Sequence, residues 1–355
     1  MANKGIDFAS SGGLSYQFHR NINDKGNMKI SPKRADQIIR AFAGKKVLVL
    51  GDLMLDEYLF GLVSRISPEA PVPVVEVDSE KLLLGGAANV AWNIRSLGGR
   101  AVPVGVTGRD RARNILAKEL SARGIPTSGL VEEKGRHTTV KTRIVAHRQQ
   151  VVRVDREHSR EISAASAGKL ISALKRLLPG CDALLIEDYN KGLVTGRLLK
   201  DALELARHYK KIVTVDPKFN HFLDFKGVTL FKPNVHETER ALGLKLKNAR
   251  DLARAGKILL EKLEAGAVLI TAGERGMFLC LPGRTIKHIP TAAREVYDVS
   301  GAGDTVIAAI TLALASGAGF EEAAVLANHA AGVEISKFGV AAVTPVELRK
   351  ALGSW

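Results

Sequence analysis

The residues best suited to chemistry stand in the run Val299-Ser300-Gly301-Ala302-Gly303-Asp304-Thr305, which leads directly into the apolar stretch 306–310. Two glycines around an alanine, at a predicted loop-to-helix transition, leave backbone N–H groups uncovered, and such groups bind anions. A carboxylate repels a bound anion, but it can take a proton from a hydroxyl that attacks a phosphorus atom held there. The spacing of Gly301, Gly303 and Asp304 therefore favours phosphoryl transfer.

A second element of small residues, Gly85-Gly86-Ala87-Ala88-Asn89, lies earlier in the chain. Glycine and alanine let a backbone approach a ligand closely, and the Asn89 amide can both donate hydrogen bonds to sugar hydroxyls and accept them. Tight packing at a helix start explains such a run equally well when it stands alone. The run 85–89 therefore indicates a ligand-binding site only in combination with the run Gly301–Asp304.

Both elements depend for their positions on an alternation of strands and helices that begins at Lys45. Buried strands are predicted at 45–52, 183–188, 212–216, 229–234 and 267–271. Helices are predicted between them, for example at 166–178, 196–209 and 248–264. This order is typical of an α/β fold with a doubly wound, mostly parallel sheet.

A polar residue recurs at the carboxyl end of each predicted strand. These residues are Asp52, Asp188, Asp216, Asn234 and Thr271. In open α/β sheets ligands bind at that edge, so these side chains are expected to converge on one crevice. Asp, Asn and Thr are also common turn formers and helix caps, and that interpretation stays open for each of them.

Two segments, 58–77 and 138–155, alternate apolar and polar residues as exposed antiparallel strands do. They are expected to form a small β-sheet that projects from the main domain. Such a sheet could act as a lid that excludes water from the site. The second segment is strongly basic, with Lys141, Arg143, Arg148 and Arg153. These residues form either a solvated strand face or, for Lys141, Arg143 and Arg153, a set of phosphate ligands.

A length of 355 residues allows one large α/β domain or two domains, and 46% hydrophobic and 25% charged residues are ordinary for a soluble globular protein. Residues 1–33 lack periodicity and are predicted to be a flexible leader before a domain at 34–355. The run 305–319 is too short to span a membrane, and no secretion signal opens the chain, so a cytoplasmic location is expected. The two cysteines, Cys181 and Cys280, are too few for a metal site.

The net charge of +15 could favour binding of nucleic acid or of a polyanionic substrate. The basic residues are spread along the chain and aromatic residues make up only 5%, so a phosphorylated small molecule is favoured over nucleic acid. No Walker A, HRD, DFG, HExxH or GxSxG pattern occurs. A GxGxxG fingerprint is also missing after the first strand, which argues against a dinucleotide-dependent oxidoreductase.

Together, Gly85–Asn89 and Asp298–Asp304 resemble the two signatures of the ribokinase-like (PfkB) carbohydrate kinase family, over about residues 44–352. The runs 51–58, 64–75 and 216–218 are similar to its D-glycero-β-D-manno-heptose-7-phosphate kinase branch. The resemblance implies a ribokinase-like fold with a lid. It also implies ATP-dependent phosphorylation of the anomeric hydroxyl of that sugar, giving the 1,7-bisphosphate used in ADP-heptose and lipopolysaccharide core synthesis. A kinase for another sugar or sugar phosphate, and a catalytically silent scaffold, remain alternatives.

The resemblance also implies roles for individual residues. Asp304 would be the base, and the N–H groups of Gly301, Ala302 and Gly303 would bind the transferring phosphoryl group. Residues implied to bind ATP are Asn234, Val235, His236, Glu237, Thr271, Gly273, Gly276 and Asn328. Glu237 would also order Mg²⁺ through water. Residues implied to bind the sugar are Asp52, Gly85, Gly86 and Asn89, with Lys218, Lys141, Arg143 and Arg153 as candidates for its distal phosphate.

Partners follow from the same resemblance. Lid strands in this family often pair across a dimer, and exposed strand edges favour pairing, so a homodimer is expected. Heptose kinases are often fused to a nucleotidyltransferase with an HxGH motif, which does not occur here, so a separate nucleotidyltransferase is expected. Assistance by a monovalent cation is left open.

Overall fold

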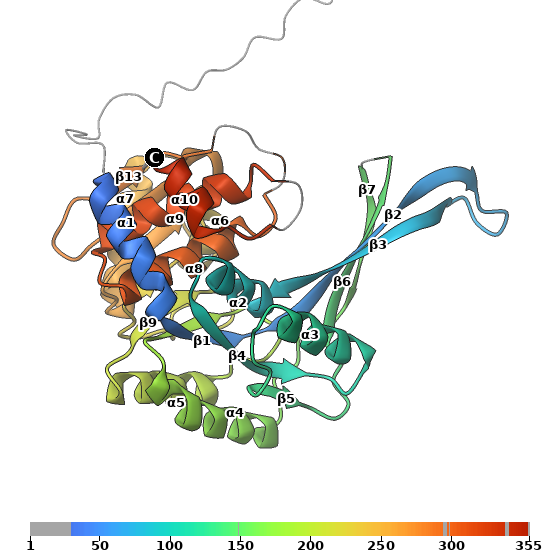
Figure 1. Cartoon of the computed structure of the whole chain (residues 1–355), viewed down its shortest axis with the longest axis horizontal. Helices are drawn as coiled ribbons and strands as arrows, with labels where there is room; N and C mark the ends of the chain where they lie inside the picture. The colour runs from blue at the N-terminus through green and yellow to red at the C-terminus, as the bar shows by residue number, and fades with distance from the viewer. Residues whose placement is uncertain (1–29, 148, 294–296, 298, 338–340, 354–355) are drawn as a thin grey trace, which may run out of the picture.

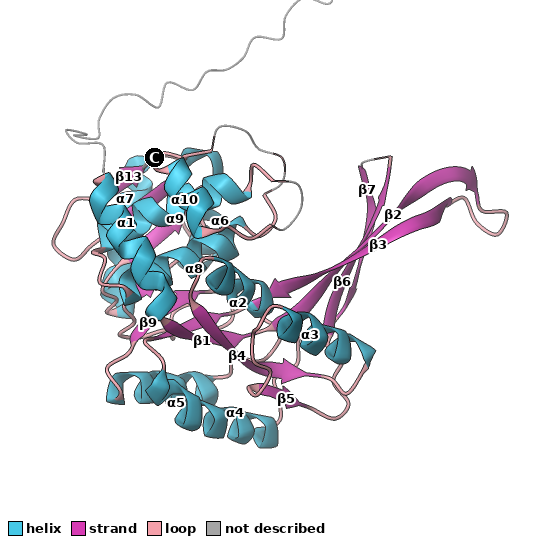
Figure 2. Ribbon diagram, in the orientation of Figure 1, coloured by secondary structure: helices cyan, strands magenta, loops and turns pink. Residues whose placement is uncertain are grey.

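The computed structural model describes residues 30–147, 149–293, 297, 299–337 and 341–353. A nine-stranded sheet with helices on both faces forms the body, and a four-stranded sheet projects from it (Figures 1 and 2). The predicted α/β architecture with a projecting lid is confirmed. Of the predicted leader, residues 1–29 lie outside the described part. Helix α1 (Pro32–Ala41) begins two residues before the predicted domain boundary.

The large sheet has the strand order β13-β12-β11-β10-β9-β8-β1-β4-β5. Pairing is parallel from β11 to β5, and β12 and β13 add an antiparallel edge. The strands are β1 (Lys46–Gly51), β4 (Arg100–Thr107), β5 (Leu130–Glu132), β8 (Ala183–Glu187), β9 (Ile212–Asp216), β10 (Leu230–Phe231), β11 (Val268–Thr271), β12 (Met277–Cys280) and β13 (Lys287–Ile289). The strand predicted at 229–234 is short because Pro233 has no N–H to donate to a neighbouring strand.

Two hydrophobic cores lie on opposite faces of this sheet because successive side chains of a strand point in opposite directions. In β1, Val47 and Val49 enter one core, and Leu48 and Leu50 enter the other. The first core is covered by α1, α2 (Ala87–Ser96), α3 (Arg111–Ala122), α8 (Ala302–Ala315), α9 (Phe320–Glu334) and α10 (Pro345–Ala351). The second is covered by α4 (Ala164–Leu177), α5 (Gly196–His208), α6 (Val235–Leu242) and α7 (Ala249–Leu263). No helix within the described ranges has both the length and the apolarity to cross a membrane.

The lid has the strand order β3-β2-β6-β7. Its strands are β2 (Leu53–Ile66), β3 (Pro73–Gly86), β6 (Thr139–Ala146) and β7 (Gln149–Arg156). The hairpin β2–β3 is longer than the predicted segment 58–77, because β2 starts immediately after β1 and β3 runs to the start of α2. The two hairpins join through parallel pairing of β2 with β6.

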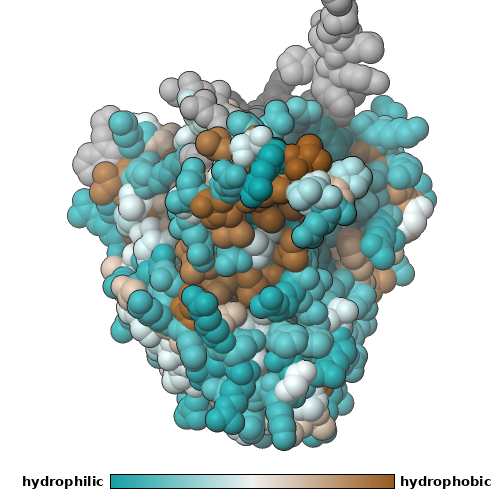
Figure 3. Space-filling view, turned by 90° about the vertical axis from the view of Figure 1, so that its right-hand side faces the viewer, coloured by the Kyte–Doolittle hydropathy of each residue, from teal (hydrophilic) through white to brown (hydrophobic). Residues whose placement is uncertain are grey.

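Several large apolar side chains of the lid are exposed. They are Leu62, Ile66, Val72, Val77, Val151, Val152 and Val154. Apolar side chains gather on the face of the molecule that looks toward the lid end (Figure 3). An exposed apolar surface of this kind marks a place where another molecule can bind.

Candidate active site

The predicted loop-to-helix transition is present at the start of α8. Gly301 is the residue before the helix and adopts φ 93°, a left-handed conformation that glycine takes without strain. Asp304 lies on the first turn and is only 5% exposed. The N–H groups of this turn and the Asp304 carboxylate therefore lie together, as phosphoryl transfer to a hydroxyl requires, and the Ala302 N–H also donates to the Val299 carbonyl at 3.4 Å. Asp298, which belongs to the same sequence signature, lies outside the described residues.

Two hydrogen bonds orient the Asp304 carboxylate. Asn89, in α2, donates from Nδ2 to Oδ2 at 2.7 Å, and Tyr189, after β8, donates from its hydroxyl to Oδ1 at 3.0 Å. Burial raises the pKa of the Tyr189 phenol well above 10, so this group stays a donor. Asn89, predicted to bind sugar hydroxyls, therefore also positions the Asp304 carboxylate.

The pKa of Asp304 is raised to about 7, chiefly because burial disfavours its charged form. The negative charge of Asp216 raises it further, whereas the hydrogen bonds from Asn89 and Tyr189 lower it. A general base is most effective when its pKa lies near the operating pH. Asp304 therefore has the burial, orientation and pKa of a general base.

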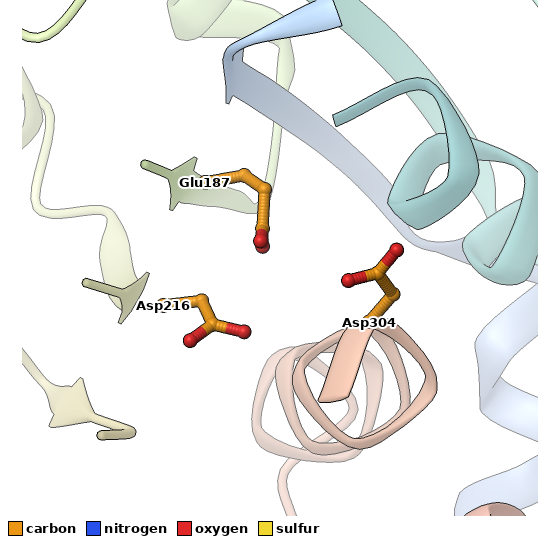
Figure 4. Close-up of side chains that lie close together, drawn as sticks. All are labelled: Glu187, Asp216 and Asp304. Atoms are coloured by element: carbon orange, nitrogen blue, oxygen red, sulfur yellow. The ribbon is translucent and has the colours of Figure 1, made fainter. Parts of the chain in front are cut away.

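Two further buried carboxylates lie beside Asp304. Glu187 and Asp216 end the neighbouring strands β8 and β9, where they are paired in register. One carboxylate oxygen from each of the three residues lies within 4.8 Å of the others (Figure 4). Lys232, 3% exposed, forms an ion pair with Asp216 at 2.7 Å.

A pocket of about 470 Å³ opens next to Asp304. Of the residues predicted for the site, Gly86, Asn89, Lys141, Arg143, Arg153, Lys218, Gly301 and Asp304 line it. Met54, Asp56, Tyr189, Asn190, Lys191, Phe219 and Ser300 complete its lining. The structure thus gathers part of the predicted sugar-binding and catalytic set around one cavity, whereas Asp52, Gly85, Ala302 and Gly303 do not line it.

Carboxylates of the lid hold its cations in place. Arg143 Nη1 lies 2.5 Å from Asp56 Oδ1 in an ion pair. Asp155 pairs with both Lys141 at 3.2 Å and Arg153 at 2.9 Å. All three basic groups line the pocket, and Arg153 also keeps 49% of its side chain exposed to solvent. Their role as phosphate ligands stays a prediction. Arg148, on the same predicted segment, lies outside the described residues.

Asp52 and Gly85 do not line the pocket, but each contacts residues that do. Asp52 Oδ2 accepts hydrogen bonds from the backbone N–H groups of Tyr189 at 2.8 Å and Lys191 at 3.2 Å. Burial, followed by the charge of Asp188, raises the pKa of Asp52 to about 6. A Cβ on Gly85 would lie 2.6 Å from Asp56 Oδ2, so a larger residue would displace the partner of Arg143. Both residues position the side chains that reach the cavity.

The predicted nucleotide side begins at α6. Asn234 and Glu237 form a capping box, in which Asn234 Oδ1 accepts from the Glu237 N–H and Glu237 Oε2 accepts from the Asn234 N–H, both at 2.8 Å. Lys218 Nζ forms an ion pair with Glu237 and also lines the pocket. Lys218 therefore lies between the predicted sugar and nucleotide sides.

The other predicted ATP-binding residues lie on α6, at the end of β11 and on α9. Val235 and His236 form the first turn of α6, and Thr271 bridges to Asn234 at the end of β11. Gly273 and Gly276 flank a tight turn with φ 58° and 76°. In α9, Asn328 Nδ2 donates to the Pro290 carbonyl at 2.7 Å.

Sequence reasoning missed four residues of this site: Asp56, Glu187, Tyr189 and Lys191. Glu187 and Asp188 are the last residues of the strand predicted at 183–188, and Tyr189 follows it. A signal was present there, because burying an acidic side chain at the end of an apolar strand costs free energy. Asp188 was noted instead, although adjacent strand residues point to opposite faces.

Comparison with known proteins agrees with the geometry. The pfkB family of carbohydrate kinases matches residues 45–347, so this chain belongs to that family. The protein is a carbohydrate kinase.

Among curated relatives, "Bifunctional protein HldE" of Geobacter sulfurreducens is 43% identical over 321 residues, covering 90% of this chain and 66% of the relative. The protein of the same name from Geobacter metallireducens is 46% identical over 306 residues, covering 86% of this chain and 62% of the relative. The chain thus spans slightly less than two thirds of the length of these relatives.

Among solved structures, ribokinase from Arabidopsis thaliana complexed with ribose and ATP has a TM-score of 0.70 at 19% identity, covering 87% of this chain and 98% of that one. Phosphofructokinase-2 from Escherichia coli in complex with potassium has a TM-score of 0.72 at 18% identity, with the same coverage. These likenesses confirm the ribokinase-like fold.

Proposed function

We propose that the protein transfers a phosphoryl group from ATP to the anomeric hydroxyl of D-glycero-β-D-manno-heptose 7-phosphate, which gives the 1,7-bisphosphate for ADP-heptose and lipopolysaccharide core synthesis. The observation that supports this substrate is a single cavity that combines the buried base Asp304 with five cationic side chains. These are Lys141, Arg143, Arg153, Lys191 and Lys218. A sugar that already bears a phosphate can place one hydroxyl at the base and its phosphate among the cations.

The residues of this chain divide the work of the reaction. Asp304 takes the proton of the attacking hydroxyl, and its pKa of about 7 leaves a large ionised fraction at neutral pH. The N–H groups at the start of α8, from Gly301 to Gly303, stabilise the charge that builds on the transferring phosphoryl group. The lid strands carry basic side chains that bind the substrate phosphate. By covering the cavity they exclude water and so limit hydrolysis of ATP.

ATP and Mg²⁺ belong to the proposal as well. Asn234, Glu237, Thr271 and Asn328 are the proposed nucleotide-side residues. Both oxygens of Glu237 already accept hydrogen bonds or ion pairs from the chain, so this carboxylate suits Mg²⁺ through a bridging water. When bound, Mg²⁺ offsets the negative charge of the nucleotide phosphates. A monovalent cation is an optional addition, since one related structure is described as a complex with potassium.

The proposed assembly is a homodimer formed through the lid, working in the cytoplasm. Two observations support it: valines are exposed on both faces of β7, and the outer edges of β3 and β7 pair with no further strand of the described ranges. A separate nucleotidyltransferase for a later step of the same route remains part of the proposal.

A coupled ADP-release assay tests the substrate. Purified protein is compared on heptose 7-phosphate, fructose 6-phosphate, ribose and adenosine, and heptose 7-phosphate should give the highest kcat/KM. Activity confined to an unphosphorylated sugar would refute the heptose phosphate and leave the kinase assignment intact. A folded protein inactive on all four would favour the silent scaffold.

A further inference from the structure

The basic side chains that line the pocket come from two different places in the fold. Lys141, Arg143 and Arg153 lie on the lid strands β6 and β7, where carboxylates of the lid pair with them. Lys218 lies on the body, two residues after the end of β9, and pairs with Glu237 at the start of α6. A ligand phosphate held by the lid cations and one held by Lys218 would therefore occupy different parts of the cavity.

Two contacts hold the Lys218 ammonium group in place. Its Nζ forms an ion pair with Glu237, whose side chain is 2% exposed, and lies 5.4 Å from the centroid of the Tyr189 ring. The Tyr189 hydroxyl in turn donates its hydrogen bond to Asp304. Lys218 therefore lies between the cap of α6 and the side chain that orients the proposed base.

The Lys218 ammonium is both charged and accessible. Burial lowers its pKa, but the negative charges of Glu237 and Asp216 outweigh burial and raise the pKa above its usual value. Lys232, the other lysine beside Asp216, is 3% exposed and packed into its ion pair. Lys218 keeps 29% of its side chain exposed and lines the pocket. Of these two lysines, Lys218 is the one that a ligand can reach.

We propose that Lys218 is a catalytic residue that binds the transferring phosphoryl group, and not the phosphate that the sugar already carries. This inference rests on the proposed phosphorylation of a sugar by ATP. In that reaction the sugar oxygen bonds to the terminal phosphorus, the bond from this phosphorus to ADP breaks, and the hydroxyl proton passes to Asp304. The phosphorus must then lie between a hydroxyl at Asp304 and a nucleotide at the cap of α6, and Lys218 spans that interval.

The charges around the start of α8 explain why a cation is needed there. Glu187, Asp216 and Asp304 lie close together (Figure 4), and each of them that is ionised repels a phosphoryl group held by the N–H groups of α8. Burial raises the pKa of Glu187 and of Asp216, and the positive charge of Lys218 is among the effects that lower it. Lys218 thus acts on the same space, where a fixed cation stabilises the charge of the transferring group.

Nucleotide binding tests the contact without any sugar. Calorimetric titration of the full chain with ADP and with the non-hydrolysable ATP analogue AMP-PNP, both with Mg²⁺, isolates the effect of the third phosphate. Lys218→Met should weaken AMP-PNP binding by roughly 10–150-fold, the usual effect of losing a hydrogen bond to a charged group, and leave ADP binding unchanged. Lys141→Met on the lid and Lys200→Met, at a 75% exposed position on α5, are matched controls and should bind both nucleotides as the wild type does.

Kinetics then distinguish the two phosphates. Lys218→Met should lower kcat by about 10²–10³-fold, as loss of one group that stabilises the transition state does. The loss should be equal on heptose 7-phosphate and on the same sugar without its phosphate, because the transferring group is the same in both reactions. Lys141→Met should instead raise KM for heptose 7-phosphate alone.

An increase in KM confined to heptose 7-phosphate in Lys218→Met, with the ratio of AMP-PNP to ADP affinity unchanged, would assign Lys218 to the sugar phosphate and overturn the proposal. Equal weakening of ADP and AMP-PNP, or wild-type behaviour, would also overturn it. If circular dichroism shows that Lys218→Met is unfolded, Lys218→Gln takes its place, because its amide can still donate to Glu237 but carries no charge. A wild type inactive on every sugar would refute the proposed function, and the comparison of AMP-PNP with ADP would still decide the role of Lys218.

Discussion

Tyr189 donates a hydrogen bond to Asp304 Oδ1 over 3.0 Å, although the two residues are 115 positions apart in the chain. Asn89 occupies the other oxygen of the same carboxylate. The Asp304 carboxylate is therefore held from two sides, by the loop after β8 and by α2. This arrangement explains how a carboxylate on the first turn of a helix can be aimed at one hydroxyl of a substrate.

Removal of the base provides the most direct prediction. Asp304→Asn should lower kcat by about 10²–10⁴-fold, the usual contribution of general-base catalysis, while ATP affinity stays within a few fold. The change keeps the size and the contact with Tyr189 but removes the proton acceptor. Steady-state kinetics and calorimetric titration with an ATP analogue measure the two effects. Asp201→Asn, on α5, is the control, and an unchanged kcat in Asp304→Asn would exclude the assigned role.

The pH dependence should report the same group. Because the pKa of Asp304 is about 7, kcat/KM should fall as the pH drops below about 7 and level off above it. The hydrogen bond from Tyr189 lowers this pKa, so Tyr189→Phe should move the acid limb to higher pH. The variant should then lose more activity at pH 6.5 than at pH 8.5. A profile that keeps its midpoint in Tyr189→Phe would contradict the coupling.

Stability should depend on pH in a defined direction. The pKa of Asp304 rises from 3.8 in the unfolded chain to about 7 in the fold, so folded-state stability falls as the pH rises from about 4 to about 7. Asp304→Asn removes this loss. Its gain in unfolding free energy over the wild type should grow across that range and reach about 4 kcal/mol at most, at about 1.36 kcal/mol per pKa unit. Urea unfolding at pH 5 and pH 8 measures the difference, and a larger gain at pH 5 would disprove it.

The sequence predicted the parts of this site that depend on local structure. The start of α8 and the cap of α6 follow from short runs of residues whose geometry is set by their own backbone. Local sequence patterns do not predict which side chains from elements far apart in the chain come into contact. The convergence of the strand ends was predicted, but nothing local indicates the register of β8 on β9, which places Glu187 and not Asp188 on the side of Asp304. Alternation likewise indicated the lid strands but not the parallel pairing of β2 with β6.

The lid surface supports a prediction about assembly. Val152 and Val154 share one face of β7, and both are about half exposed, at 45% and 53%. If this face is the dimer contact, the double change Val152→Asp and Val154→Asp should convert the dimer to a monomer, because burial of unpaired charges is costly. Sedimentation velocity measures the mass. Val346→Asp, at a 68% exposed position on α10, should leave the dimer intact. A wild type that sediments as a monomer would refute the contact.

The substrate phosphate should depend on Arg143. Its guanidinium is held against Asp56 in the pocket wall, and hydrogen bonds to charged groups contribute about 1.5–3 kcal/mol. Arg143→Ala should therefore raise KM for heptose 7-phosphate by roughly 10–150-fold, with KM for ATP unchanged. The KM for the same sugar without its phosphate should change little, since that sugar offers the guanidinium no anion. Arg156→Ala, an exposed position on the same lid strand as Arg153, is the matched control and should behave as the wild type. Equal increases in KM for both sugars would show that Arg143 supports the lid and does not bind the phosphate.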